Sequence, residues 1–323
     1  MTYSILARDP QTGAIGAAVQ SHFFGVGAIA PWARAGVGAV ATQGFAEVSY
    51  GPRGLDRLAA GEDVERALSA LTAADPGAEG RQVAMLDARG EIAVHTGARC
   101  IEHAGHRVGG SASVQGNMLR EPSVWPAILE GYRRSTAPTF AHRLLDALGA
   151  GEAQGGDIRG CQSAAILVVA AEAAPHPAEG VLVDLRVDDH RDPLAELRRL
   201  ADLQIAYGEI GALADQPGLL VGDASTVTRA VLDDAVATLT AAQEVLGDNP
   251  EADFWQAVVL ARAGDIERAR ARLAAAAKAN PALPTFFRRL PAAGILPNDE
   301  SLLDAVAPRG GDRDTITMTG AAS

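Results

Sequence analysis

The first strand-like segment of the chain begins with a hydroxyl side chain. Thr2 is followed directly by Tyr3, Ile5 and Leu6, a pattern typical of a β-strand. A threonine that becomes the first residue of a chain carries both a nucleophilic hydroxyl and an α-amine. Ser4 shares the same strand face, because side chains alternate, but it lacks a base of its own. These residues indicate nucleophilic chemistry, and a β-branched residue that simply starts a strand is the alternative.

Two short stretches contain residue types that bind metals. Asp188, Asp189 and His190 stand just before an expected helix, where acidic side chains favour helix-start capping over metal binding. His103 and His106 lie close together, but no further Cys or His follows at zinc spacing. The glycine-rich segments match neither the P-loop nor the dinucleotide pattern, and no nucleophile-elbow motif occurs. The sequence therefore predicts no metal and no nicotinamide, flavin or nucleotide cofactor.

Composition restricts the class of protein. The 323 residues are 48% hydrophobic but only 4% aromatic, so we expect a sizeable core built from aliphatic side chains. The net charge of −12 argues against a nucleic-acid partner. Cys100 and Cys161 are too few for a disulfide framework, and we expect inert thiols. Neither a signal segment nor an apolar run of ~20 residues is evident, which predicts a cytoplasmic protein without membrane association.

The predicted elements of the first two-thirds of the chain occur in blocks. We expect strands at 2–9, 14–21, 36–43, within 81–97, and at 107–119, 162–173 and 180–189. We expect helices within 52–75 and at 123–134, 139–148 and 193–213. This order lacks the regular alternation of a parallel sheet, and it fits two antiparallel sheets covered by helices, an α+β layered sandwich.

From about residue 224 the pattern becomes helical throughout. The stretch 255–281 resembles a tetratricopeptide-type helical pair, with Gly264 in the turn, then Ala269 and Pro281. A single pair cannot be a stable solenoid, and its apolar face is larger than one pair can bury, which predicts a homodimer. The expected division is a first domain at 1–212, a helical domain at 224–297 and a flexible tail at 298–323.

Eleven stretches, in order along residues 1 to about 212, resemble the bacterial family DUF1028. They are MTYSILARD, VQSHFFGVG, PWARAGVGAVATQ, YGPRGL, AADPG, RQVAMLD, AVHTGARC, AGHRVG, SVQGNML, RGCQSAAILVV and LRVDDHRDPLAELRRL. The resemblance implies an N-terminal nucleophile (Ntn) hydrolase with an αββα four-layer sandwich. The helical part resembles an extension often attached to this family and catalogued as peptidoglycan-binding, although no sequence feature supports such binding.

The resemblance also implies how Thr2 acts. Initiator Met is normally removed before a small residue, so Thr2 becomes the first residue of the mature chain. Its α-amine has a pKa of about 7.7–8.0 in water, and burial lowers that pKa, so the amine can accept the hydroxyl proton. The implied function is an amidohydrolase that cleaves a small amide or peptide-like bond. A non-catalytic relative, acting as a ligand-binding or assembly module, is the alternative.

Donors and cations complete the implied site. An acyl-transfer site needs hydrogen-bond donors for the oxyanion, and Asn117 and Gln43 are the candidates. Related enzymes place a cation near the nucleophile. Because Lys278 is the only lysine, Arg8 is the available substitute, with Arg34 and Arg53 as further candidates. Turn or strand-end hydrogen bonds and a rim ion pair are the structural alternatives for these side chains.

Polar residues that end strands complete the candidate set. Ser21 and His22 follow the second strand, where related folds carry a polar residue near the nucleophile, and His95 ends another strand. We assign Ser21, His22, Gln43 and His95 to substrate binding. A buried, hydrogen-bonded histidine is the alternative for His22.

Overall fold

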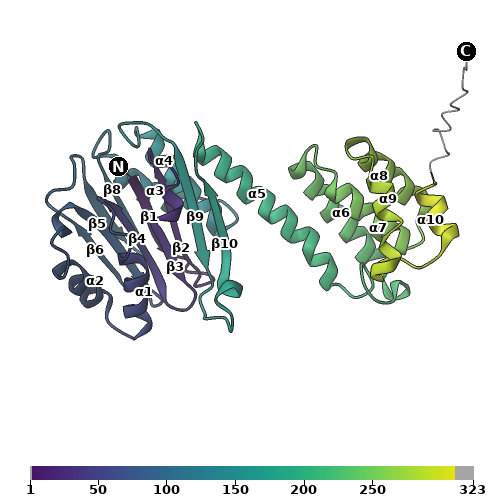
Figure 1. Cartoon of the computed structure of the whole chain (residues 1–323), viewed down its shortest axis with the longest axis horizontal. Coiled ribbons are helices and arrows are strands. Elements are labelled where there is room, and N and C mark those ends of the chain that lie inside the picture. Colours follow the sequence, from purple (N-terminus) through teal and green to yellow (C-terminus); the bar gives the residue numbers. More distant parts are fainter. Residues whose placement is uncertain (1, 310–323) are drawn as a thin grey trace, which may run out of the picture. The chain divides into compact units, whose positions relative to one another are not determined.

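The chain divides into two compact units. The structure is a computed structural model that describes residues 2–309, with units at 2–201 and 202–309 (Figure 1). The division falls inside helix α5 (Pro193–Ala212), earlier than the boundary near residue 212 that the sequence predicts. The first half of α5 belongs to the core of the first unit and its second half to the core of the second.

The larger sheet of the first unit has six antiparallel strands in the order β10-β9-β2-β1-β8-β7. Its strands are β1 (Thr2–Arg8), β2 (Ile15–Ser21), β7 (Gly105–Gly109), β8 (Ala112–Asn117), β9 (Ser163–Val169) and β10 (Val181–Val187). The sequence predicts a single strand over 107–119, and this is wrong, because the chain turns at Gly110 (φ +63°) and forms the hairpin β7–β8. The first strand therefore lies at the centre of the sheet, between β2 and β8.

The second sheet has four antiparallel strands in the order β3-β4-β5-β6. Its strands are β3 (Pro31–Arg34), β4 (Gly38–Gly44), β5 (Arg81–Asp87) and β6 (Ile92–Thr96). The strand expected at 36–43 and the hairpin expected within 81–97 are confirmed. The short strand β3 is absent from the sequence-based expectation, because four residues are too few to show a period.

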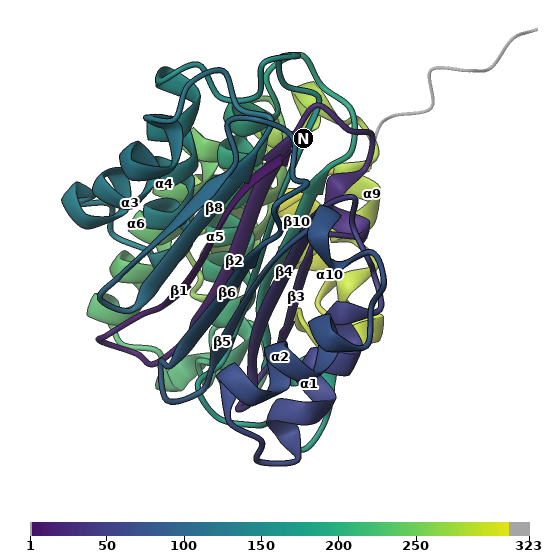
Figure 2. The same ribbon diagram turned by 90° about the vertical axis from the view of Figure 1, so that its left-hand side faces the viewer.

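Helices cover the outer face of each sheet, as Figure 2 shows. α3 (Val124–Arg134), α4 (Phe140–Ala153) and the first half of α5 pack on the larger sheet. α1 (Tyr50–Ala59) and α2 (Val64–Ala73) pack on the smaller one, and Asp63 caps α2 by accepting from the backbone N–H groups of Glu65 and Arg66. The order helices, sheet, sheet, helices confirms the expected α+β layered sandwich.

The space between the sheets is apolar at one end and polar at the other. Leu6 of β1 and Leu86 of β5 lie in the apolar end among small alanines. Because side chains alternate along a strand, the same inner faces carry polar residues further along. These buried residues are Ser4, Gln43, Gln82, Gln115 and Asn117. The fold thus gathers amide and hydroxyl groups at the end of the sandwich where β1 begins.

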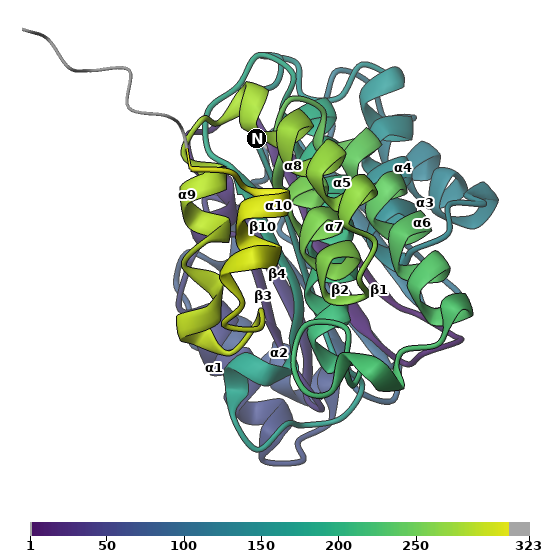
Figure 3. The ribbon, with the colours of Figure 1, turned by 90° about the vertical axis from the view of Figure 1, so that its right-hand side faces the viewer.

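The second unit is built from helices around one apolar core (Figure 3). They are α6 (Arg229–Leu246), α7 (Glu251–Arg262), α8 (Ile266–Ala279), α9 (Leu283–Phe287) and α10 (Glu300–Val306), preceded by the second half of α5. The turn between α7 and α8 contains Gly264 at φ +79°, as expected for the helical pair. None of the helices within 2–309 is long and apolar enough to cross a membrane.

The tail predicted at 298–323 is partly helical. α10 lies inside it and buries Leu303 and Val306 in the core of the second unit. The sequence-based prediction overlooked this helix, which is short and has only these two buried apolar residues, three positions apart. Residues 310–323 of this tail lie outside the described residues. The expected homodimer stays a prediction, which light scattering tests.

Gln20 provides a test of how the larger sheet packs against its helices. Its side chain is completely buried, and neither amide atom has a hydrogen-bond partner among residues 2–309. A buried polar group without a partner costs about 1–3 kcal/mol, so Gln20→Met should raise the free energy of unfolding by about 1–2 kcal/mol. Urea denaturation measures the change.

Gln115→Met is the matched control. Gln115 is equally buried, but its amide accepts from Ser113 Oγ (2.9 Å) and donates to Ser4 Oγ (2.6 Å). The same substitution there should lower the free energy of unfolding by about 1–3 kcal/mol, because the Ser113 hydroxyl loses its acceptor and Ser4 Oγ loses a donor. Equal losses from both variants would contradict this account.

Candidate active site

A row of polar side chains crosses the larger sheet where β1 begins. The strand register places Thr2 opposite Asn117 of β8, and Ser21 of β2 opposite Ser163 of β9. Thr2 Oγ1 lies 3.1 Å from Ser21 Oγ, which is a buried hydrogen bond between two hydroxyls. Thr2 is only 6% exposed. The structure therefore brings together three of the predicted site residues, Thr2, Ser21 and Asn117.

Gln43 connects the smaller sheet to Thr2. Its Nε2 donates to the carbonyl oxygen of Thr2 (3.2 Å) and to Gln82 Oε1 (2.7 Å), and its Oε1 accepts from Ser4 Oγ (2.8 Å). A weaker contact joins Nε2 to the carbonyl oxygen of Gln115 (3.4 Å). Because these partners occupy its amide, Gln43 positions the backbone of Thr2 and is not the oxyanion donor that the sequence suggested.

Gln82 is the centre of this network, and sequence reasoning missed it. It lies opposite Gln43 in the β4–β5 pair, and its Oε1 also accepts from Asn117 Nδ2 (3.0 Å). Its Nε2 lies 2.9 Å from the carbonyl oxygen of Gly116 and 3.0 Å from Thr96 Oγ1. A glutamine on the inner face of an otherwise apolar strand was the available signal.

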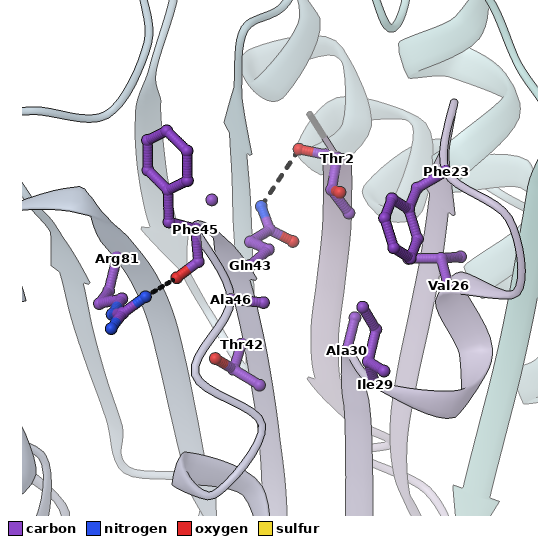
Figure 4. A pocket seen from close by; sticks show the side chains of 11 residues that line it. Thr2, Phe23, Val26, Ile29, Ala30, Thr42, Gln43, Phe45, Ala46 and Arg81 are labelled. Carbon is purple, nitrogen blue, oxygen red and sulfur yellow. Dashed lines mark hydrogen bonds between the residues drawn. The ribbon is translucent and has the colours of Figure 1, made fainter. Parts of the chain in front are cut away.

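A pocket of about 460 Å³ opens beside Thr2 (Figure 4). One wall is the segment that follows β2, with Phe23, Val26, Ile29 and Ala30. The other is the end of β4 and the residues after it, Thr42, Gln43, Gly44, Phe45 and Ala46, together with Arg81. Thr2 lies between the two walls in Figure 4. This volume is within the range of about 300–1,000 Å³ that is typical of small-molecule sites.

Gly44 directs the chain into the second wall. It has φ +83°, and a Cβ atom there would lie 2.8 Å from the carbonyl oxygen of Gly80. Only glycine meets both requirements without strain. The turn places Phe45 at the rim of the pocket, where the Phe45 backbone N–H donates to the Gly80 carbonyl (3.0 Å).

Arg81 is the cation of the pocket, and its charge is compensated. Its Nε donates to Asp75 Oδ2 at 2.9 Å, Glu47 lies 4.0 Å away, and another N–H donates to the carbonyl oxygen of Phe45. The hydrogen bond from Arg81 lowers the pKa of Asp75 from 3.8 to about 2. Tyr50 also donates to Asp75 (3.0 Å), and burial raises the pKa of that phenol.

Arg8 and His95 lie away from Thr2. Arg8 is at the far end of β1, about 20 Å along an extended strand, where its Nε donates to the carbonyl of Ala88 (3.1 Å). His95 Nε2 pairs with the carbonyl of Ala78 (2.9 Å) on the helix-covered side of β6. The structure thus does not bring these two predicted residues into the site, because strand length and side-chain alternation carry them elsewhere.

His22 follows Ser21 directly but does not line the pocket. Its backbone N–H donates to Asp157 Oδ2 (2.9 Å), which ties the end of β2 to the segment before β9. The carboxylate of Asp157 is completely shielded from solvent, and Arg159 lies 3.3 Å away. His22 therefore lies next to Ser21 in the chain but is not among the residues that line this pocket.

The sequence also contains acidic residues just before α5 and two cysteines, and the structure shows the contacts of each. Asp192, and not Asp188 or Asp189, caps α5 by accepting from the backbone N–H of Ala195 (3.1 Å). Cys100 and Cys161 are separate thiols, and burial raises the pKa of each. Among residues 2–309, no group of three His, Cys, Asp or Glu side chains could hold a metal ion.

Replacing Gln82 tests the network. Gln82→Leu removes the oxygen that accepts from the amides of Gln43 and Asn117. We therefore expect the free energy of unfolding to fall by at least about 3 kcal/mol. Gln216→Leu, at an exposed position, should change it by no more than about 0.5 kcal/mol. Urea denaturation of both variants gives the comparison, and a near-neutral Gln82→Leu would contradict the central role of this residue.

The ion pair between Asp75 and Arg81 predicts that the folded protein loses stability as the pH becomes acidic. Because the folded-state pKa of Asp75 is lowered, its ionised form stabilises the fold above pH 3.8, and this contribution is lost as the pH falls toward about 2. Asp75→Asn should therefore be less stable than wild type at pH 6 and equal to it near pH 2. Unfolding curves at several pH values measure this.

Asp56→Asn is the control for this loss of stability at acid pH. It removes an exposed ion pair with Arg34, which contributes about 0–1 kcal/mol. A stability difference between wild type and Asp75→Asn that persists undiminished at pH 2 would contradict the role of the Asp75 carboxylate.

Comparison with known proteins identifies the first unit. A model described as a family of unknown function, DUF1028, matches residues 2–197. A crystal structure of a protein from Silicibacter pomeroyi, titled as a DUF1028 protein, shares 36% sequence identity. The match has a TM-score of 0.56 and covers 62% of this chain and 87% of that one. No curated protein matches. The chain belongs to the DUF1028 family.

Proposed function

We propose that this protein is an N-terminal nucleophile amidohydrolase that cleaves a small amide or peptide-like bond. Thr2 is the nucleophile after removal of Met1. The observation that carries the proposal is the placement of Thr2. It starts the central strand, its hydroxyl is hydrogen-bonded to Ser21, and it lies on the wall of a ligand-sized pocket. A β-branched residue needed only to begin a strand has no requirement for such a pocket.

The reaction takes two steps. The neutral α-amine of Thr2 accepts the hydroxyl proton as Oγ1 attacks the amide carbonyl, and the ammonium then gives that proton to the leaving nitrogen as the C–N bond breaks. The acyl group remains as an ester on Oγ1. Water, deprotonated by the same amine, attacks the ester; the Oγ1–C bond breaks, the ammonium returns its proton to Oγ1, and the carboxylic acid is released. Both steps require the neutral form of this amine.

The neighbouring side chains have distinct roles in this scheme. Ser21 orients Thr2 Oγ1 through their hydrogen bond, and Gln43 holds the Thr2 carbonyl. Asn117 is held by Gln82 through an N–H···O bond, and a primary amide has two hydrogens, so its second can serve the oxyanion. Arg8 lies at the far end of β1, about 20 Å from Thr2, and therefore takes no part in this scheme.

Thr2→Ala should abolish amide hydrolysis, since it removes the nucleophile while leaving the strand intact. Intact mass spectrometry of the purified protein should show loss of Met1, and a β-lactone probe should add its mass to the peptide that begins with Thr2. Thr2→Ser should retain measurable activity, because it keeps both the hydroxyl and the amine.

A form with a short extension before Thr2 is the matched control. It keeps the hydroxyl but converts the amine into an amide, so we expect at least a hundredfold loss of rate, in line with removal of a general base. Retention of Met1 in the native protein would overturn the proposal and favour the non-catalytic ligand-binding module. Full activity of the extended form would overturn the role of the α-amine as the base.

A further inference from the structure

The walls of the pocket beside Thr2 are mostly apolar. Six of its eleven lining residues are hydrophobic: Phe23, Val26, Ile29, Ala30, Phe45 and Ala46. Phe23 is 52% exposed and Phe45 is 61% exposed, and they belong to the two opposite walls. In a chain with so few aromatic residues, two exposed rings at one pocket are a surface that an apolar ligand would bury.

The polar side chains of the lining already have partners inside the protein. Thr42 Oγ1 donates to the carbonyl of Glu47 (3.1 Å), and the amide of Gln43 is occupied by the network. Arg81 donates to Asp75 and to the carbonyl of Phe45. Thr2, whose hydroxyl is bonded to Ser21, is the residue at which the reacting carbonyl would lie. Recognition of the rest of the ligand therefore depends on apolar contact.

The charges around the pocket disfavour an anionic ligand. Arg81 is flanked by two carboxylates, Asp75 at 2.9 Å and Glu47 at 4.0 Å. The pKa of each carboxyl is lowered, chiefly by the hydrogen bond from Arg81 for Asp75 and by hydrogen bonds from Ser49 for Glu47, so both are ionised at neutral pH. A substrate carboxylate would therefore meet a cation whose charge two neighbouring carboxylates already offset.

We infer that this pocket holds the acyl group of the substrate and that the acyl group is neutral and apolar. The substrates are then amides of uncharged aliphatic or aromatic carboxylic acids. The inference rests on the proposed hydrolysis at Thr2 and specifies its substrate class. The acyl part is assigned to the pocket because it stays bound through both steps, while the amine leaves and water enters. A volume of about 460 Å³ accommodates a medium-length chain or one aromatic ring.

A series of acyl 4-nitroanilides tests the inference. We expect kcat/KM to rise about fourfold for each methylene between acetyl and hexanoyl, from about 0.8 kcal/mol per buried CH₂. Glutaryl 4-nitroanilide, which matches pentanoyl in length but ends in a carboxylate, should be cleaved at least tenfold more slowly than pentanoyl. Equal or faster cleavage of the glutaryl compound would overturn the inference.

Variants at the rim test whether the preference for longer acyl chains arises in this pocket. Phe45→Ala and Phe23→Ala should flatten the dependence on chain length, because each removes an apolar wall. Phe24→Ala is the matched control, since Phe24 is the adjacent aromatic residue, is 66% exposed and does not line the pocket. An unchanged chain-length dependence in both wall variants would contradict the assignment.

Binding to the Thr2→Ala protein separates this inference from the proposed function. Calorimetry with the same nitroanilides should give affinities that rise with chain length and a glutaryl compound that binds weakly. If wild type cleaves nothing but these affinities hold, the hydrolase proposal fails and the pocket assignment stands. If hydrolysis occurs at Thr2 without the chain-length order, or Thr2→Ala binds none of the series, the pocket assignment fails.

Discussion

The hydrogen bond between Gln43 and Gln82 is the contact on which the site depends. Both amides lie on the inner face of the smaller sheet, and from there they bond the Thr2 carbonyl, Ser4 and Asn117 on the larger one. In a buried environment these bonds are strong, and an unmade one is costly. The network therefore fixes both the separation of the two sheets and the position of the first residue of β1.

The division of the inter-sheet space into two halves explains the composition. Ala39, Ala41 and Ala84 line the apolar half, and such small side chains let the sheets approach closely. Large aromatic residues have no place there, which fits their low frequency in the chain. Two of the exposed aromatics instead stand at the rim beside Thr2, so the polar half of the sandwich opens into an apolar pocket. Thr2 and an apolar wall thus meet at one end of the fold.

Most of the layered architecture could be predicted from the pattern of strands and helices, and part of the site with it. Thr2, Ser21 and Asn117 were accessible because a hairpin and the alternation of β-strands bring strand ends together. The same reasoning from strands and strand ends also assigned Arg8 and His95 to the site, and the structure places both of them elsewhere. A residue on the correct strand, or at the end of one, can still lie about 20 Å away or on the opposite face.

The sequence by itself determined which segments are strands, which faces are polar, and that a hydroxyl residue heads the first strand. It also contained the resemblance to the family. Only the tertiary structure decided which polar residues meet: Gln82, Gln115 and Arg81 reach the site through strand pairs and a sheet-to-sheet contact. Ser4 and Gln115, for example, are 111 residues apart in the chain. Local propensity cannot specify such contacts, because they exist only once distant strands have paired within a sheet, as here, or two sheets have packed face to face, as for Gln43 and Thr2.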